Sequence, residues 1–276
     1  MPNPNPAPLC DRPIGVFDSG LGGLTVVRAI RTQLPHESII YLGDTARVPY
    51  GARSPETIIR YARTCGRALA ARNIKMLVVA CNTVSAVALD VLRVELDLPV
   101  LGVIVPGASA AVQASRSGRI GVIATTSTVA SGAYARAVAA QSSTAEVHSL
   151  AAPLLVPLVE EGWLDDPITE QVIARYLAEL VPHEIDALVL GCTHYPMLHG
   201  PLERVAARVL GAQVAVVDSA QATASELKDF LSQRGLATTL PHSTLKLMVT
   251  DRPQQFAAVA SRFLGHTIED VSLIDL

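Results

Sequence analysis

The chain has 276 residues, of which half are hydrophobic and 17% are charged, so it can bury one large domain or two smaller ones, and it is not a disordered protein. A formal net charge of −3 without a long basic run argues against nucleic-acid binding. No stretch approaches the roughly 20 consecutive apolar residues that cross a bilayer and the start lacks a signal-peptide pattern, so we expect a cytoplasmic protein.

The elements begin after a Pro- and Asn-rich extension, residues 1–12, that we expect to be disordered. Most of the expected strands are apolar throughout, which is typical of parallel strands buried on both faces. In chain order they are Ile14–Phe17, Ile39–Leu42, Met76–Ala80, Val100–Val105, Ile120–Ala124, Ala187–Leu190, Val214–Val217 and Leu245–Val249.

Helical stretches alternate with these strands. Ser54-Pro55 and Asp166-Pro167 each place a capping side chain before a proline, which predicts where two helices begin. The stretch from Pro153, running into Glu160, is expected to be a loop. Regular strand–helix alternation predicts βαβ units and therefore an α/β fold with doubly wound parallel sheets.

Two pairs of segments resemble each other within the chain. MLVVACNT at Met76–Thr83 is similar to ALVLGCTH at Ala187–His194, and GVFDSG at Gly15–Gly20 is similar to AVVDSA at Ala215–Ala220. Each segment is a strand followed by a polar turn. The repetition predicts two similar lobes related by an approximate two-fold axis.

We expect residues 13–105 together with 220–276 to form the first lobe, which carries Asp18 and Cys81. Residues 106–219 are expected to form the second lobe, which carries Cys192. Ligands of open α/β sheets bind beyond the carboxyl ends of the strands. The active site is therefore expected in the cleft between the lobes.

The four cysteines are Cys10, Cys65, Cys81 and Cys192. They form no CxxC pair, so we expect no metal site. Cys10 lies in the extension and Cys65 on an amphipathic helix, and both are expected to be incidental or structural. Cys81 and Cys192 each follow a predicted strand. Either one alone has the plain interpretation of a small buried hydrophobic residue.

A thiol at a helix N-terminus tends to have a lowered pKa, and the free N–H groups there favour an anionic ligand. One such cysteine would suggest covalent catalysis. Two at equivalent positions of facing lobes suggest that one removes a proton from a carbon and the other returns it to the opposite face. The pair Cys81 and Cys192 therefore predicts a two-base inversion.

Other polar residues accompany the two thiols. Asp18 begins a glycine-rich turn that lacks the GxGxxG spacing of a nucleotide-binding loop. It is either a capping residue of a tight turn or an acid beside Cys81, with the glycines allowing close approach of a substrate. His194, two residues after Cys192, is either structural or able to orient or protonate that thiol. No lysine lies in a recognisable pyridoxal phosphate context, so we expect no cofactor.

Six segments resemble the bacterial glutamate racemases over nearly the whole chain, from about Ile14 to near residue 265. In order they are IGVFDSGLGGLTV, YLGDTARVPYG, ACNTVSA, GVIVPGA, LVPLVEEG and LGCTHYP. The resemblance implies two similar lobes with the active site between them. It also implies interconversion of L- and D-glutamate without pyridoxal phosphate or metal, the D-glutamate feeding peptidoglycan synthesis, and a homodimer.

The resemblance also implies roles for individual residues. Cys81 and Cys192 would be the catalytic pair, with Asp18 assisting the first thiol and His194 the second. Glu160, or its neighbour Glu161, would be an acid near the second cysteine. The substrate-binding residues would be Asp18, Ser19, Pro49, Tyr50, Gly51, Asn82, Thr83, Thr125 (or Thr128), Thr193 and His194.

Three other functions compete with this interpretation. A racemase of aspartate or another acid could share both cysteines, whereas a lyase or decarboxylase on this fold would need only one. A binding protein is the third, because some glutamate racemases are reported as a family to inhibit DNA gyrase, although this sequence has no motif for that interaction. Activation by a peptidoglycan precursor is left open.

Overall fold

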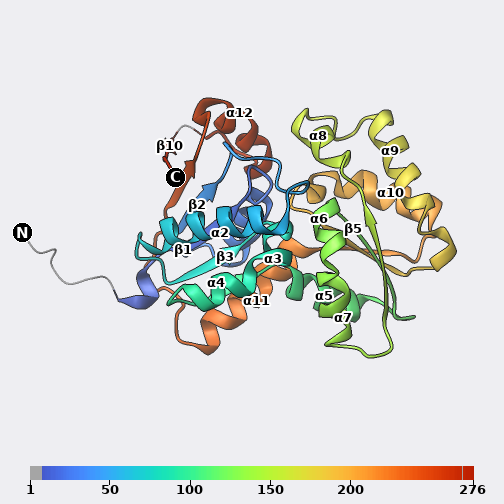
Figure 1. Ribbon diagram of the computed structural model, residues 1–276, viewed down its shortest axis with the longest axis horizontal. Helices are drawn as coiled ribbons and strands as arrows, with labels where there is room; N and C mark the ends of the chain where they lie inside the picture. The colour runs from blue at the N-terminus through green and yellow to red at the C-terminus, as the bar shows by residue number, and fades with distance from the viewer. Residues whose placement is uncertain (1–7, 269) are drawn as a thin grey trace, which may run out of the picture.

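The computed structural model describes residues 8–268 and 270–276, which form two parallel β-sheets flanked by helices (Figure 1). The first sheet has the spatial order β10 (Val271–Leu273), β9 (Leu245–Val249), β2 (Ile39–Gly43), β1 (Ile14–Asp18), β3 (Met76–Val79) and β4 (Val100–Gly102). The second has the order β6 (Glu146–Ala151), β5 (Arg119–Ala124), β7 (Ala187–Gly191) and β8 (Ala215–Asp218). All these pairings are parallel, which confirms the predicted α/β fold.

Helices cover both faces of each sheet. Around the first sheet lie α1 (Leu24–Gln33), α2 (Pro55–Ala70), α3 (Asn82–Val87), α4 (Leu89–Glu95), α11 (Ser219–Gln233) and α12 (Pro253–Leu264). Around the second lie α5 (Ile104–Ala114), α6 (Thr126–Ser131), α7 (Ala133–Ala139), α8 (Leu155–Glu160), α9 (Pro167–Ala178) and α10 (His199–Val209). The predicted caps are confirmed: Ser54 accepts from the Thr57 amide and Asp166 from the Ile168 amide.

Burial on both faces explains the apolar strands. In β1, Val16 shares one core with Val27 of α1, whereas Phe17 shares the opposite core with Ile58 of α2. The core that contains Val16 also contains Leu188 of β7. Helix α11 packs against both α1 and α5. The two sheets are therefore joined by a continuous apolar core.

The two sheets repeat one strand order. The series β2-β1-β3-β4 of the first matches β6-β5-β7-β8 of the second, which pairs β3 with β7 and hence Cys81 with Cys192. The proposed match between Gly15–Gly20 and Ala215–Ala220 is wrong, because β1 corresponds to β5 and β8 to β4. Asp218 instead caps α11 by accepting from the Ala220 amide at 2.8 Å. The residue boundaries of the two lobes stay a prediction.

Two local expectations are wrong and two strands were not predicted. The strand expected at Val100–Val105 ends at Gly102, because α5 begins at Ile104. The stretch after Pro153 is not a loop: it forms α8, and Pro157 is tolerated in the first turn because no intrahelical acceptor is available there. Strand β6 was missed because it lies at a sheet edge, is only partly buried and carries polar residues. Strand β10 was missed because it has only three residues, also at an edge.

Part of the N-terminal extension, which we expected to be disordered, forms regular structure. Leu9–Asp11 form a 3-10 helix, and residues 1–7 of the predicted disordered extension lie outside the described residues. Lys75, which is buried, holds this segment: its Nζ donates to the Cys10 carbonyl at 2.7 Å, the Leu236 carbonyl at 2.8 Å and Glu37 Oε2 at 2.5 Å. The N-terminal segment and the connection after α11 thus meet at one buried charge.

Every helix in the described part of the chain is too short or too polar to cross a bilayer.

Candidate active site

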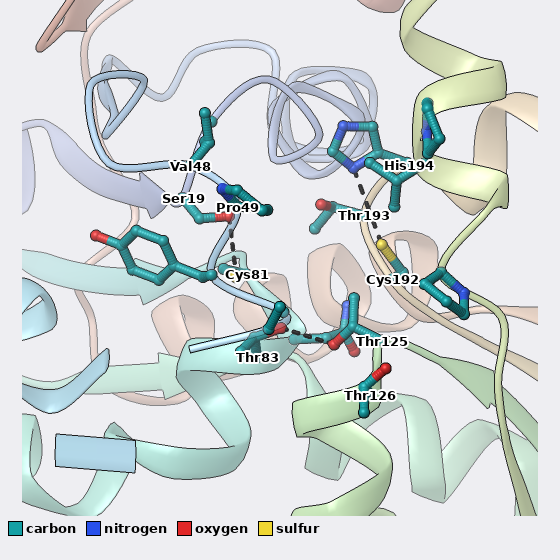
Figure 2. Close-up of a pocket in the computed structure, with 18 of the residues that line it drawn as sticks. Ser19, Val48, Pro49, Cys81, Thr83, Thr125, Thr126, Cys192, Thr193 and His194 are labelled. Carbon is teal, nitrogen blue, oxygen red and sulfur yellow. Dashed lines mark hydrogen bonds between the residues drawn. The ribbon is translucent and has the colours of Figure 1, made fainter. Parts of the chain in front are cut away.

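A cavity of about 270 Å³ lies where the carboxyl ends of the two sheets face each other. Figure 2 shows Ser19 and Cys81 on one side of it, Cys192, Thr193 and His194 on the other, and Thr83 beside Thr125. All the predicted site residues except Asp18 line the cavity. The placement agrees with ligand binding at the carboxyl ends of parallel strands.

Cys81 follows β3 and occupies the N-cap position of α3. The residue is 5% exposed, and its thiol donates to Ser19 Oγ at 3.4 Å. Burial, followed by the charge of Asp18, raises the pKa of Cys81 to about 12. The expected lowering of this pKa is therefore wrong, because loss of water and a neighbouring carboxylate outweigh the field of a six-residue helix.

Asp18 lines no part of the cavity. It is fully buried at the end of β1, where Oδ2 accepts from the Gly20 amide at 2.9 Å and Oδ1 from Thr193 Oγ1 at 3.5 Å. Burial raises the pKa of Asp18, and the positive charge of His194 opposes that rise. Asp18 thus links residues from both sheets.

The glycines after Asp18 allow close packing, at Gly22 against the other half of the molecule and at Gly23 against the end of β1 itself. A Cβ on Gly22 would lie 2.2 Å from Thr193 Oγ1 and 2.6 Å from His194 Nδ1, and a Cβ on Gly23 would lie 2.5 Å from Asp18 Cβ. Of these glycines only Gly20 lines the cavity. The expectation that this turn opens space for a substrate is therefore wrong for Gly22 and Gly23.

On the opposite side, His194 connects Cys192 to an acid. Its Nδ1 lies 3.9 Å from Cys192 Sγ and its Nε2 lies 3.1 Å from Glu160 Oε1. Burial alone would lower the pKa of His194, but hydrogen bonds with Cys192 and Glu160 outweigh it and raise the pKa to about 10. The raised pKa keeps the ring as an imidazolium at neutral pH, with its positive charge beside the Cys192 side chain.

Helix α8 decides which glutamate faces His194. Glu160 ends the helix, lines the cavity and contacts the imidazole, whereas Glu161 follows as the C-cap residue and does not line the cavity. The two neighbours differ by about 100° in direction on a helix. The structure thus places Glu160, and not Glu161, beside His194 in the cavity that Cys192 also lines.

Hydroxyl and amide groups line the cavity between the thiols. Thr83 Oγ1 lies 2.9 Å from Thr125 Oγ1 and 3.3 Å from Thr128 Oγ1. Asn82 Oδ1 accepts from the Tyr134 hydroxyl at 2.7 Å. Asn82 Nδ2 is buried and has no hydrogen-bond partner among the described residues. A buried donor of this kind is costly unless a ligand satisfies it.

Tyr50 lines the cavity, but its hydroxyl is bound to another side chain. Its hydroxyl donates to Asp44, which also accepts from Thr250 Oγ1 at 2.9 Å. The hydroxyl is therefore already engaged, and the rest of the residue is left to meet a ligand. Cys65 lies near this network, with Arg47 Nη2 3.6 Å from its Sγ, and burial raises its pKa. The structural interpretation of Cys65 agrees with this position.

Comparison with known proteins places the chain in one protein family. A family model described as Asp/Glu/Hydantoin racemase matches residues 14–227.

The chain belongs to the Asp/Glu/hydantoin racemase family.

Its relatives within this racemase family cover almost the entire chain. It is 48% identical over 268 residues to a glutamate racemase of Chlorobaculum tepidum, covering 96% of this chain and 97% of the relative. A crystal structure of a Bacillus anthracis glutamate racemase is 40% identical, with a TM-score of 0.91 over 96% of this chain and 98% of that one. The Francisella tularensis glutamate racemase in complex with D-glutamate is 36% identical, with a TM-score of 0.88 over the same shares.

Sequence patterns missed the apolar wall of this racemase cavity. Val48, Pro153, Val156 and Pro157 line it, the last three from α8 and the turn before it. They carry no reactive group, so no chemical pattern marks them. In the described part of the chain, no group of three or more His, Cys, Asp or Glu side chains is arranged to hold a metal ion.

Proposed function

We propose that this protein interconverts L- and D-glutamate by two-base proton transfer between Cys81 and Cys192, without a cofactor. One observation carries the proposal: thiols from equivalent strand ends, after β3 and β7, line one cavity from its two sides. An inversion at one carbon requires an acid and a base on opposite faces.

The reaction conserves protons and electron pairs. The thiolate takes the α-hydrogen as a proton, so that the Cα–H bond breaks, an S–H bond forms and the electron pair stays on the substrate. The opposite thiol then gives its proton to the other face of the same carbon. The cysteines exchange protonation states in each turnover, and the reverse reaction uses them in the opposite order.

The two thiols on opposite sides of the cavity have differently charged neighbours. The imidazolium of His194 lies 3.9 Å from Cys192 Sγ, so a positive charge stands beside the thiol that acts as the base. Cys81, whose pKa is raised to about 12 by burial and by Asp18, starts as a protonated acid. Asp18 and His194 act as positioning and electrostatic residues for the two thiols, and Glu160 holds the imidazole.

Hydrogen-bond donors in the cavity hold the amino acid. Asn82 Nδ2, which has no hydrogen-bond partner among the residues that the structure describes, is a donor for a substrate carboxylate, and Thr83, Thr125 and Thr193 add hydroxyl groups. The apolar wall excludes water and so strengthens these contacts. Ser19, Pro49, Tyr50 and Gly51 complete the enclosure from the first sheet.

The product defines the wider role. D-glutamate supplies peptidoglycan synthesis in the cytoplasm, and the protein works there as a homodimer. The support for this role is the family membership and the 48% identity to a glutamate racemase over nearly the full length.

The test incubates the purified, reduced protein with L-glutamate in D₂O, with chelator and no added cofactor. Loss of optical activity together with deuterium at the α-carbon is expected. Cys81→Ser and Cys192→Ser should each lower kcat at least about a thousandfold, because a serine hydroxyl has a far higher pKa than a thiol: it is a weaker acid and does not ionise near neutral pH to act as the base. Cys10→Ser, remote from the cavity, is the control. Wild-type turnover by either of the first two variants would overturn the proposal.

A further inference from the structure

The cavity is closed by a contact between two segments from different sheets. One is the turn after β2 that contains Tyr50 and Gly51, and the other is the start of α6, which follows β5. Gly51 and Thr125 line the cavity from these two segments. Whatever joins them sets the width of the space in which a substrate lies.

Ser127 of α6 connects the two segments through hydrogen bonds. Its backbone N–H donates to the Gly51 carbonyl at 3.0 Å and its Oγ–H to the same oxygen at 2.8 Å. The hydroxyl also lies 3.3 Å from the Arg53 carbonyl. Ser127 itself does not line the cavity. Its only hydrogen bonds to the other half of the molecule, within the described residues, are made to this turn.

Gly51 and Thr125 are packed so closely that no side chain fits at residue 51. A Cβ on Gly51 would lie 2.8 Å from Thr125 Cβ and 3.0 Å from Thr125 Cγ2. Thr125 in turn lies 2.9 Å from Thr83 Oγ1 across the same junction. A shift of the turn away from α6 would therefore widen the cavity at the point where Gly51 meets Thr125.

We propose that Ser127 is a positioning residue that fastens the Tyr50–Gly51 turn to α6 and so holds the cavity at the width that binds the amino-acid substrate. The proposal rests on the proposed function for the identity of that substrate. The hydroxyl adds a second hydrogen bond to a carbonyl that the backbone already holds. Its removal should loosen the turn without unfolding the protein.

The test compares Ser127→Ala with Ser131→Ala. Ser131 lies on the same helix, but its hydroxyl donates to the Thr128 carbonyl at 2.6 Å, within α6, and not to the turn. We expect Ser127→Ala to raise KM for glutamate about three- to tenfold, the effect of one hydrogen bond, with kcat changed less than about twofold. Ser131→Ala should change neither constant, and Ser127→Thr should restore KM.

A second readout is independent of catalysis. Amide hydrogen exchange of the ligand-free protein should become faster in residues 47–53 of Ser127→Ala and should stay unchanged there in Ser131→Ala. If the wild-type protein fails to racemise glutamate while this difference is present, the proposed function fails and the role of Ser127 in holding the turn stands. Equal exchange and equal KM in the two variants would overturn the role of Ser127.

Discussion

At the residue scale, the two thiols of the cavity have opposite electrostatic surroundings. Cys81 faces the buried carboxylate of Asp18, which adds to the effect of burial in raising its pKa. Cys192 faces the imidazolium of His194, which Glu160 supports at 3.1 Å. A symmetric strand order therefore places the two thiols in different electrostatic surroundings.

Replacing Glu160 with Gln tests this asymmetry through pH dependence. The pKa of His194, about 10 in the native protein, is raised partly by Glu160, so the substitution lowers it. Activity that needs the imidazolium is present below this pKa and lost as the pH rises through it. The alkaline limb of kcat/KM should move to lower pH by roughly one unit or less, since Glu160 is half exposed.

The matched control is Glu161→Gln, which removes a neighbouring charge that does not contact the imidazole. Its alkaline limb should stay within a few tenths of a unit of the wild-type position, a residual effect of a screened surface charge. An unchanged limb in Glu160→Gln, or a shift to higher pH, would contradict the assignment of Glu160 as the partner of His194.

At the scale of elements, short segments between strands and helices build the site. The turn between β1 and α1 packs against Thr193 and His194 after β7, and glycine is required at residue 22 because a Cβ would collide with both side chains. Helix α8 brings Glu160 and part of the apolar wall to the cavity. Each segment therefore acts across the junction between the sheets.

Gly22→Ala should damage activity more than stability alone explains. The added methyl displaces Thr193 and His194, which costs about 1–3 kcal/mol of unfolding free energy, the range for overpacking, and should lower kcat at least about tenfold. Urea denaturation and steady-state kinetics measure the two effects. Gly200→Ala is the control, because its Cβ would meet only Arg204 Nη1, at 3.4 Å. Equal kinetics in the two variants would show that this contact is dispensable.

At the scale of the whole molecule, a shared apolar core and one buried ion pair hold distant segments together. Lys75 and Glu37 are both almost completely buried, and the remaining acceptors of Lys75 are carbonyls of Cys10 and Leu236. Glu37 also accepts from the Thr238 amide at 2.9 Å. The end of the first sheet opposite the cavity therefore depends on a satisfied charge network.

Lys75→Met should destabilise the protein by about 3–5 kcal/mol, because it leaves the Glu37 carboxylate buried without its cation. The unfolding midpoint in guanidinium chloride measures the loss. Combining Lys75→Met with Glu37→Gln removes the uncompensated charge and should recover part of the stability. If the single and double variants unfold at the same midpoint, the pair is not the source of the effect.

Much of the architecture follows from local patterns in the sequence. Apolar runs located the interior strands because burial on both faces leaves no polar positions, and Ser54 and Asp166 marked helix starts through their capping groups. The similarity of Met76–Thr83 to Ala187–His194 paired the two cysteines correctly. Edge strand β6 was not predicted, because a strand with only one neighbouring strand tolerates polar residues.

By itself, the sequence determined the α/β fold, the interior strands and which polar residues follow them, since these depend on the periodicity and chemistry of neighbouring residues. Only the tertiary structure decided how those groups behave together. The raised pKa of Cys81, the contact of Glu160 with His194 and the hydrogen bond of Tyr134 to Asn82 each arise from residues distant in the chain. Burial and electrostatic coupling depend on distances in space, and those exist only once the two sheets have packed.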